Sequence, residues 1–191
     1  LLDGTSDGVA LNGWLRITPE GRVQLVMPRS EMGQGVHTAL AMLVAEELDV
    51  ALASVQLIEA GHDAIYGNVA MIVGSLPAQP EDSEPGAETR TVRASRWVVG
   101  KIARELGINA TGGSTSIADL WEPLRWAAAT ARGQLLGAAS LQWKLPVDEL
   151  KVNGGVVSHD GGERAHYGQF AKAAAKIPPG NVQLKARSDW K

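Results

Sequence analysis

Cysteine is absent from this chain of 191 residues, and its absence excludes several kinds of protein. Without a thiol there can be no disulfide, no thiolate nucleophile and no cysteine-ligated zinc or iron–sulfur cluster. The histidines are His37, His62, His159 and His166, and none of them is part of a metal-binding spacing such as H-E-x-x-H. We therefore expect no metal ligated by the protein itself. A metal would have to be carried by an organic cofactor.

The sequence also lacks a strong positive charge, a long apolar run and a signal peptide, and each of these absences excludes a class of protein. The net charge of −3 gives no general attraction for nucleic acid, which needs a concentrated basic face. No apolar run is long enough to cross a bilayer, which takes about 18 residues or more. The first residues, Leu1-Leu2-Asp3-Gly4, lack the basic region and apolar run of a signal peptide. We expect a soluble chain whose N-terminus looks cut from something longer.

The first part of the sequence predicts alternating strands and helices. Residues 14–27 read as a hairpin, because apolar residues alternate on both sides of a Pro19-Glu20-Gly21 turn. Residues 36–48 have apolar side chains at helical spacing, and residues 54–59 read as a strand. Glu46 and Glu47 on this helix are interpreted as solvated rather than as acid–base groups.

The rest of the chain predicts further helices around an irregular stretch. Residues 67–89 combine prolines with acidic side chains, which favours an exposed loop. Helices are predicted at residues 91–106, 120–143 and 169–176, and a hairpin near residues 150–157. Ser116 and Asp119 resemble a weak capping box, and Pro123 would lie in or near the first turn of the helix that follows. The fold class is α+β: one domain over residues 1–191, with mixed strands and hairpins packed with three or four helices.

Two glycine-containing loops run into helices and could carry binding chemistry. The first is Met32-Gly33-Gln34-Gly35, where the amide of Gln34 can donate and accept hydrogen bonds to a heterocycle edge. The second is Gly112-Gly113-Ser114-Thr115-Ser116, whose hydroxyls and backbone N–H groups suit a phosphate. Neither loop matches the dinucleotide or P-loop fingerprint. The residues alone leave three possibilities open: cofactor loops, a generic phosphate-binding module, or turns in a non-catalytic structural or subunit-contact domain.

The run Glu31-Met32-Gly33-Gln34-Gly35-Val36-His37-Thr38 resembles the E-M-G-Q-G-x-H-T motif of the xanthine oxidase family of molybdenum hydroxylases. The later run from Ala110 to Ser116, followed by Trp121-Glu122-Pro123-Leu124-Arg125, is similar to the large subunit of isoquinoline 1-oxidoreductase and to bacterial membrane-bound aldehyde dehydrogenases. The resemblance covers the chain from about Leu11 onward and implies a fold like a molybdopterin-binding domain.

The resemblance implies which residues contact the cofactor, a molybdopterin carrying molybdenum, in bacteria usually in its cytosine dinucleotide form. The implied contacts are Met32, Gly33, Gln34, Gly113, Ser114, Thr115 and Ser116. Where the broader family has another hydroxyl residue after the second loop, this chain has Ile117. A shared cofactor requires the two loops to lie side by side.

The resemblance also implies what this chain lacks. The family's reaction oxidises aldehydes or N-heterocycles with water-derived oxygen, and its general base is a glutamate far toward the C-terminus of a longer chain. No position here matches that motif, so no catalytic residue is assigned. We expect a fragment or one chain of a larger enzyme, inactive alone, with the remainder of the large subunit or a companion chain and an iron–sulfur subunit as partners. Family members often carry an export signal, which implies a periplasmic or membrane-associated location.

Overall fold

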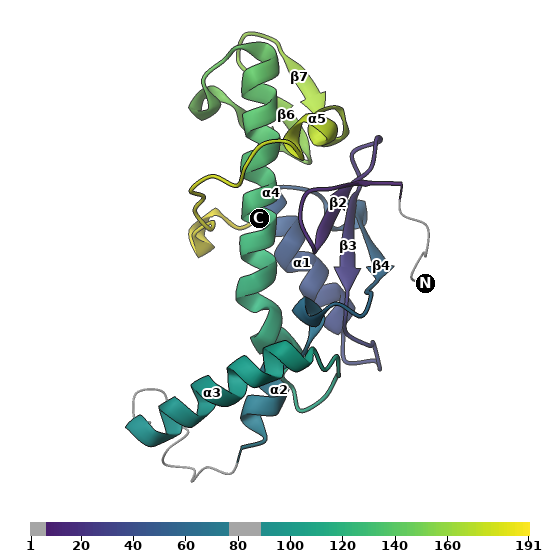
Figure 1. Cartoon of the computed structure of the whole chain (residues 1–191). Coiled ribbons are helices and arrows are strands. Elements are labelled where there is room, and N and C mark those ends of the chain that lie inside the picture. Colours follow the sequence, from purple (N-terminus) through teal and green to yellow (C-terminus); the bar gives the residue numbers. More distant parts are fainter. Residues whose placement is uncertain (1–6, 77–88) are drawn as a thin grey trace. The chain divides into compact units, whose positions relative to one another are not determined.

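The computed structural model describes residues 7–76 and 89–191. They form two compact units. Unit 1 contains the described residues of Leu1–Met27, His37–Glu59 and Trp121–Lys191, and unit 2 those of Pro28–Val36 and Ala60–Leu120. All the strands of the described residues belong to unit 1 together with helices, whereas unit 2 is helical, and this mixture confirms the α+β class (Figure 1).

Unit 1 is built on a sheet in the order β1-β2-β3-β4. The strands are β1 (Val9–Ala10), β2 (Leu15–Ile17), β3 (Val23–Met27) and β4 (Val55–Glu59). β2 and β3 pair antiparallel, so the predicted hairpin is confirmed, and Gly21 in its turn has a φ of 86°. β3 and β4 pair in parallel, and helix α1 (Val36–Leu48) lies in the connection between them.

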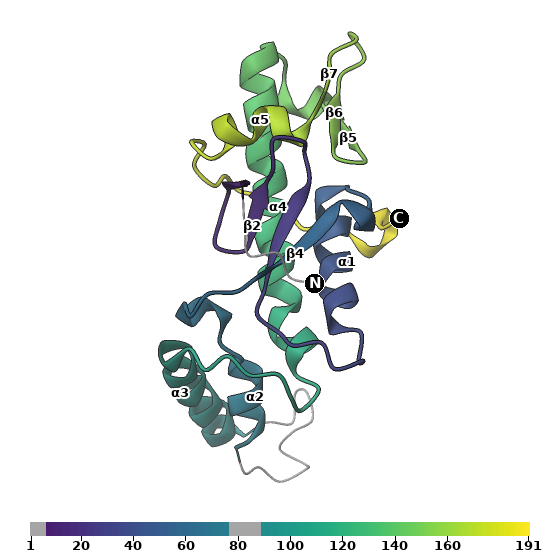
Figure 2. The same cartoon turned by 90° about the vertical axis from the view of Figure 1, so that its right-hand side faces the viewer.

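The core of unit 1 lies around this sheet. Every residue of β3 is buried, as expected for a central strand covered on both faces. Helix α1 lies alongside the sheet (Figure 2) and buries Leu40, Val44 and Leu48 completely. Glu47 of the same helix is also fully buried, so its interpretation as solvated is wrong. Arg125 Nε donates to Glu47 Oε1 at 2.7 Å and Arg132 lies 3.8 Å from Oε2, which compensates the buried carboxylate.

Helix α4 (Ser116–Trp143) is the longest element. Another segment of this chain packs close against it, because a Cβ added at Gly133 would lie 2.8 Å from Val182 Cγ1. The helix begins four residues before the predicted start at Leu120, so Pro123 lies inside it and not in its first turn. The predicted capping box is also wrong, because the side chain of Asp119 bonds to other segments.

The C-terminal part of unit 1 holds a three-stranded sheet and one more helix. The strands are β5 (Lys151–Asn153), β6 (Val156–Ser158) and β7 (Arg164–His166), all paired antiparallel. The sequence predicted the β5–β6 hairpin but not β7, whose three residues show no apolar alternation. Helix α5 (Tyr167–Ala174) begins and ends two residues before the predicted bounds.

Unit 2 holds two helices that pack side by side, α2 (Val69–Gly74) and α3 (Arg90–Leu106) (Figures 1 and 2). Gly100 of α3 lies under α2, where a Cβ would be 3.6 Å from Val73 Cγ2. The predicted loop at residues 67–89 is therefore wrong at α2, where the side chain of Asn68 caps the helix by accepting from Met71 N–H. Residues 77–88 of that predicted loop lie outside the described residues.

Short 3-10 turns complete the described chain, at Leu52–Ser54, Ala64–Tyr66, Val147–Glu149 and Arg187–Asp189. No helix in residues 7–76 or 89–191 has the length and apolar character to cross a membrane. Over the same residues, no group of three or more His, Asp and Glu side chains is placed to hold a metal ion.

Candidate functional site

Both glycine loops belong to unit 2. We call residues 28–35 loop 1 and residues 109–116 loop 2. Loop 1 follows β3 and loop 2 follows α3, so the two are far apart in sequence. The backbone N–H of Ser30 donates to Thr111 Oγ1 at 2.9 Å, which joins the loops directly. This bond places the two loops side by side at Ser30 and Thr111.

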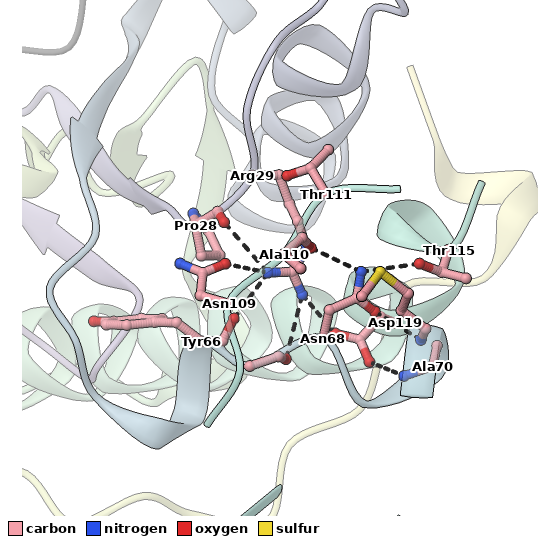
Figure 3. Close-up of polar contacts among 12 residues, drawn as sticks. Pro28, Arg29, Tyr66, Asn68, Ala70, Asn109, Ala110, Thr111, Thr115 and Asp119 are labelled. Carbon is pink, nitrogen blue, oxygen red and sulfur yellow. Dashed lines mark hydrogen bonds and ion pairs between the residues drawn. The ribbon is translucent and has the colours of Figure 1, made fainter. Parts of the chain in front are cut away.

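Arg29 of loop 1 is the centre of this junction (Figure 3). Its side chain is completely buried and makes an ion pair with Asp119 near the start of α4, with Nη2 and Oδ2 2.7 Å apart. Its Nη1 donates to Asn109 Oδ1 at 3.0 Å and to the Tyr66 carbonyl at 2.8 Å. Burial lowers the pKa of the Arg29 guanidinium, and Asp119 opposes that shift. Arg29 therefore ties loop 1 to Asn109 at the start of loop 2 and to Asp119, three residues after the end of loop 2.

Asp119 and Asn68 extend the junction to α2. The second carboxylate oxygen of Asp119 accepts from the backbone N–H of Ala70 at 2.9 Å. Asn68 is almost fully buried, and its Nδ2 donates to the Ala110 carbonyl at 3.0 Å and to Thr115 Oγ1 at 2.9 Å (Figure 3). Thr115 in turn donates to the Gly112 carbonyl. The shape of loop 2 is thus fixed by loop 1, by the segment that precedes α2, and by a bond within loop 2 itself.

Loop 1 is held by its own side chains. Glu31 Oε1 accepts from the backbone N–H groups of Gly33 and Gly35, at 2.8 and 2.9 Å. Gln34 Oε1 accepts from Met32 N–H, and Gln34 Nε2 donates to the Ser30 carbonyl at 2.9 Å. An amide has two lone pairs and two hydrogens, so Gln34 retains one of each for a ligand. Met32 is 69% exposed above this loop.

Loop 2 presents polar groups that the described chain does not use. Gly113 and Ser114 are exposed and both adopt the left-handed conformation, with φ of 60° and 56°. Within residues 7–76 and 89–191, no acceptor is recorded for the backbone N–H groups of Gly113 and Ser114, and no partner for the hydroxyls of Ser114 and Ser116. Serine in this conformation carries strain, which clusters at functional sites. Four polar groups are thus unused: three on the exposed residues Gly113 and Ser114, and one on Ser116, which is buried at the first residue of α4.

The glycines of both loops leave room for a ligand to approach the backbone. A Cβ added at Gly33 or Gly35 would meet no atom within 4 Å, and one at Gly113 would lie 3.7 Å from Thr115 Cγ2. Their positive φ values, 90°, 80° and 60°, are the conformations that glycine adopts most readily. Open space together with N–H donors at a helix N-terminus fits an anionic group such as a phosphate.

Sequence reasoning identified the loops but missed the residues that join them. Arg29, Asn68 and Asp119 are ordinary polar residues in the sequence, and only folding shows that they converge. The one available signal was that Arg29 comes only two residues after the buried strand of residues 23–27, so that little chain separates its charge from the core. Thr115, predicted as a cofactor contact, uses its hydroxyl to hold loop 2.

Comparison with known families tests the resemblance. Residues 4–75 match the molybdopterin cofactor-binding domain family. That match includes loop 1 and ends before loop 2. Together with the relatives below, it confirms the resemblance to the xanthine oxidase family of molybdenum hydroxylases that the two loop motifs indicated.

Curated relatives extend the similarity to loop 2. The chain is 33% identical to isoquinoline 1-oxidoreductase subunit beta of Brevundimonas diminuta over 184 residues, which is 95% of this chain and 19% of that protein. It is 24% identical to the membrane-bound aldehyde dehydrogenase [pyrroloquinoline-quinone] of Gluconacetobacter polyoxogenes, over 91% of this chain and 20% of that protein. The chain therefore spans about a fifth of the length of these relatives.

A solved structure shows the same fold at lower identity. CO dehydrogenase from Oligotropha carboxidovorans aligns with 87% of this chain and 16% of its own, with a TM-score of 0.50 and 17% identity. This likeness concerns the fold alone. It supports the α+β architecture.

Proposed function

We propose that this chain binds molybdopterin carrying molybdenum through loop 1 and loop 2, as the cofactor-binding portion of a molybdenum hydroxylase that oxidises aldehydes or N-heterocycles. The observation that carries the proposal is the junction of the two loops through Ser30 and Thr111, beside polar groups of loop 2 that the described chain leaves unused. Unrelated turns have no physical reason to converge in this way.

The polar groups of the two loops divide the work of holding the cofactor. The hydroxyls of Ser114 and Ser116 and the N–H groups of Gly113 and Ser114 donate to phosphate oxygens, at the positive end of the α4 dipole. Gln34 offers its remaining hydrogen and lone pair to the edge of the pterin, and Gly33 and Met32 lie along the same loop. Thr115 supports loop 2 from behind. The bound group supplies the redox chemistry, and this chain orients it.

The finer identity of the cofactor and its partners follows from the family resemblance. The expected form is the cytosine dinucleotide, with iron–sulfur clusters on a partner chain, because this chain has no cysteine. The catalytic glutamate is expected on the remainder of the large subunit or on a companion chain. A periplasmic or membrane-associated location is expected by the same resemblance. The 191-residue chain alone should oxidise neither aldehydes nor N-heterocycles.

A matched pair of glycine variants tests the cofactor proposal. Gly113 and Gly154 have φ of 60° and 59°, and neither would place a Cβ closer than 3.7 Å to another atom. Gly113→Val and Gly154→Val should therefore cost similar stability, about 1–2 kcal/mol, because both force an L residue into the left-handed region. Only Gly113→Val should lower the molybdenum and pterin bound per chain, measured in the assembled enzyme.

The same design applies to loop 1, with Gly162 as the control for Gly33. Their φ values are 108° and 90°, and a Cβ at either would meet nothing within 4 Å. Gly33→Val should lose cofactor, and Gly162→Val should keep it. Equal loading in all four variants would favour the alternative, a structural or subunit-contact domain whose glycine loops bind no cofactor.

A further inference from the structure

Helix α3 of unit 2 presents an unusual outer surface. Five of its residues are basic, Arg90, Arg93, Arg96, Lys101 and Arg104, and only Glu105 is acidic. The chain as a whole has a net charge of −3, so this helix departs from the balance of the protein. The inner face of α3 packs on α2 through Gly100 and on the turn before α2 through Gly107. The basic residues other than Arg96 are exposed.

The exposed cations form a line along the helix. Arg90, Arg93, Lys101 and Arg104 share one face with Trp97, because their separations of three and four residues repeat the helical turn. The line spans 14 residue steps, about 21 Å at 1.5 Å per residue. Among residues 7–76 and 89–191, no acidic side chain is recorded in an ion pair with any of these four cations.

An apolar stripe runs beside this basic line. Val98, Ile102 and Leu106 recur every four residues and are 47%, 53% and 62% exposed. Trp97 is 62% exposed, and Lys101 Nζ lies 4.4 Å from the centre of its ring. We call the eight residues together, the four cations of the basic line, Trp97 and the three residues of the apolar stripe, the outer face of α3. Tryptophan is favoured where one side of a ring meets an apolar phase and the other meets water.

We propose that the outer face of α3 binds the surface of an anionic phospholipid bilayer, with the helix lying parallel to that surface. The four cations attract anionic headgroups, and their long side chains can reach those headgroups while the backbone lies deeper. Trp97 and the apolar stripe enter the boundary between headgroups and acyl chains, as in other basic amphipathic helices. Glu105 lies at the end of the face, where it opposes the attraction of the other charges.

Lipid suits this face better than nucleic acid or a protein partner. Phosphates of nucleic acid would satisfy the basic line but would leave the apolar stripe in water. The buried centre of a protein interface is depleted in charged residues and in Lys especially, whereas here Lys101 lies in the middle of the face.

Four acidic residues precede the helix in sequence, Glu81, Asp82, Glu84 and Glu88. The attraction must therefore come from the basic line itself and not from the net charge of the region.

Vesicle flotation with the 191-residue chain tests this proposal. The chain should float with vesicles of phosphatidylcholine containing about one third phosphatidylglycerol, and should not float with phosphatidylcholine alone. Arg93→Gln combined with Arg104→Gln should lower the partition coefficient about 25-fold, because each cation near such a surface contributes about fivefold. Trp97→Ser should lower it without changing the charge.

The matched control removes the same charge elsewhere. Arg22 and Lys176 are exposed residues of unit 1, so Arg22→Gln combined with Lys176→Gln should leave flotation unchanged. Circular dichroism confirms that each variant is folded. The proposal is overturned if the chain does not bind the anionic vesicles, or if both double variants lose binding equally. It is also overturned if Trp97→Ser abolishes self-association in gel filtration while vesicle binding is absent, since the face would then bind a second copy. The cofactor proposal does not depend on any of these outcomes.

Discussion

Loop 1 and loop 2 both turn at glycines with positive φ, yet their polar groups are held differently. In loop 1 the side chain of Glu31 occupies the N–H groups of Gly33 and Gly35, and Gln34 bonds to its own loop. In loop 2 the support comes from outside, through Asn68 and the Arg29–Asp119 pair. The donors of Gly113 and Ser114 remain unused in the described chain.

This difference suggests a division of roles. A loop whose N–H groups are already bonded contributes shape and a few remaining contacts, because a ligand would have to displace an internal carboxylate to use them. A loop that is supported by other segments leaves its own N–H donors free to bind an anion. Little reorganisation energy is then needed when the anion binds. We therefore expect loop 2 to bind the phosphate and loop 1 to lie along the edge of the pterin.

The largest effect on stability is expected from removing Arg29, the side chain that links the two loops. Arg29→Ala leaves the carboxylate of Asp119 buried without its partner, and breaking such a pair typically costs about 3–5 kcal/mol. The free energy of unfolding, from urea denaturation, should fall by that amount. Arg29→Lys keeps a charge but loses the fork that reaches Asn109 and Asp119 together, so it should recover only part of the loss.

An exposed ion pair gives the control for this comparison. Lys151 and Asp160 lie 2.7 Å apart with side chains 66% and 79% exposed. Lys151→Ala should change the free energy of unfolding by less than about 1 kcal/mol. Similar losses for the two variants would show that the Arg29 junction does not organise the loops.

A second pair separates support from binding within loop 2. Thr115→Val removes a hydroxyl that bonds to Gly112 and Asn68, and should cost about 1–3 kcal/mol. Ser116→Ala removes a hydroxyl that has no recorded partner in the described chain, and should change stability by less than about 0.5 kcal/mol. Cofactor content should nevertheless fall in the Ser116 variant. The account of loop 2 is wrong if Ser116→Ala lowers stability and leaves loading intact.

A smaller effect than those of Arg29→Ala and Thr115→Val is expected in loop 1. Glu31→Gln keeps an oxygen that can accept from Gly33 and Gly35 but removes its charge, which weakens both bonds. The global free energy of unfolding should fall by about 0.5–1 kcal/mol. Amide hydrogen exchange at Gly33 and Gly35 should become faster, and exchange at Gly113 should not change. Unchanged exchange at Gly35 would show that Glu31 does not hold this loop.

The parts of the fold that the sequence predicted are those with strong local signals. The hairpin of residues 14–27, helix α1 and the bounds of helix α3 follow from period and turn chemistry. Helix α2 was missed because its six residues lie close to a proline-rich stretch, although Asn68 directly before them is a local N-cap signal. The start of α4 was predicted too late. Ser116 and Asp119 resembled a capping box, whereas the side chain of Asp119 in fact pairs with Arg29.

The candidate site was predictable only as two motifs. Composition and helix ends indicated both loops, and family resemblance gave them a cofactor. The junction that brings them together depends on buried hydrogen bonds between residues 80 to 90 positions apart, such as Arg29 with Asn109 and Asp119. No local pattern encodes such pairs. The burial of Glu47 was missed for the same reason, because its arginine partners lie 78 and more positions away.

The central claim, that loop 2 is shaped to bind a cofactor, is tested most directly at Ser114. Its φ of 56° is strained for serine, so Ser114→Gly should raise the free energy of unfolding by about 0.5–1 kcal/mol. Lys144→Gly relieves the same strain at a φ of 59° on an exposed residue that follows α4, and should stabilise the chain equally. Molybdenum and pterin bound per chain in the assembled enzyme should fall for Ser114→Gly and stay constant for Lys144→Gly. Unchanged loading in a stabilised Ser114→Gly variant would contradict the claim.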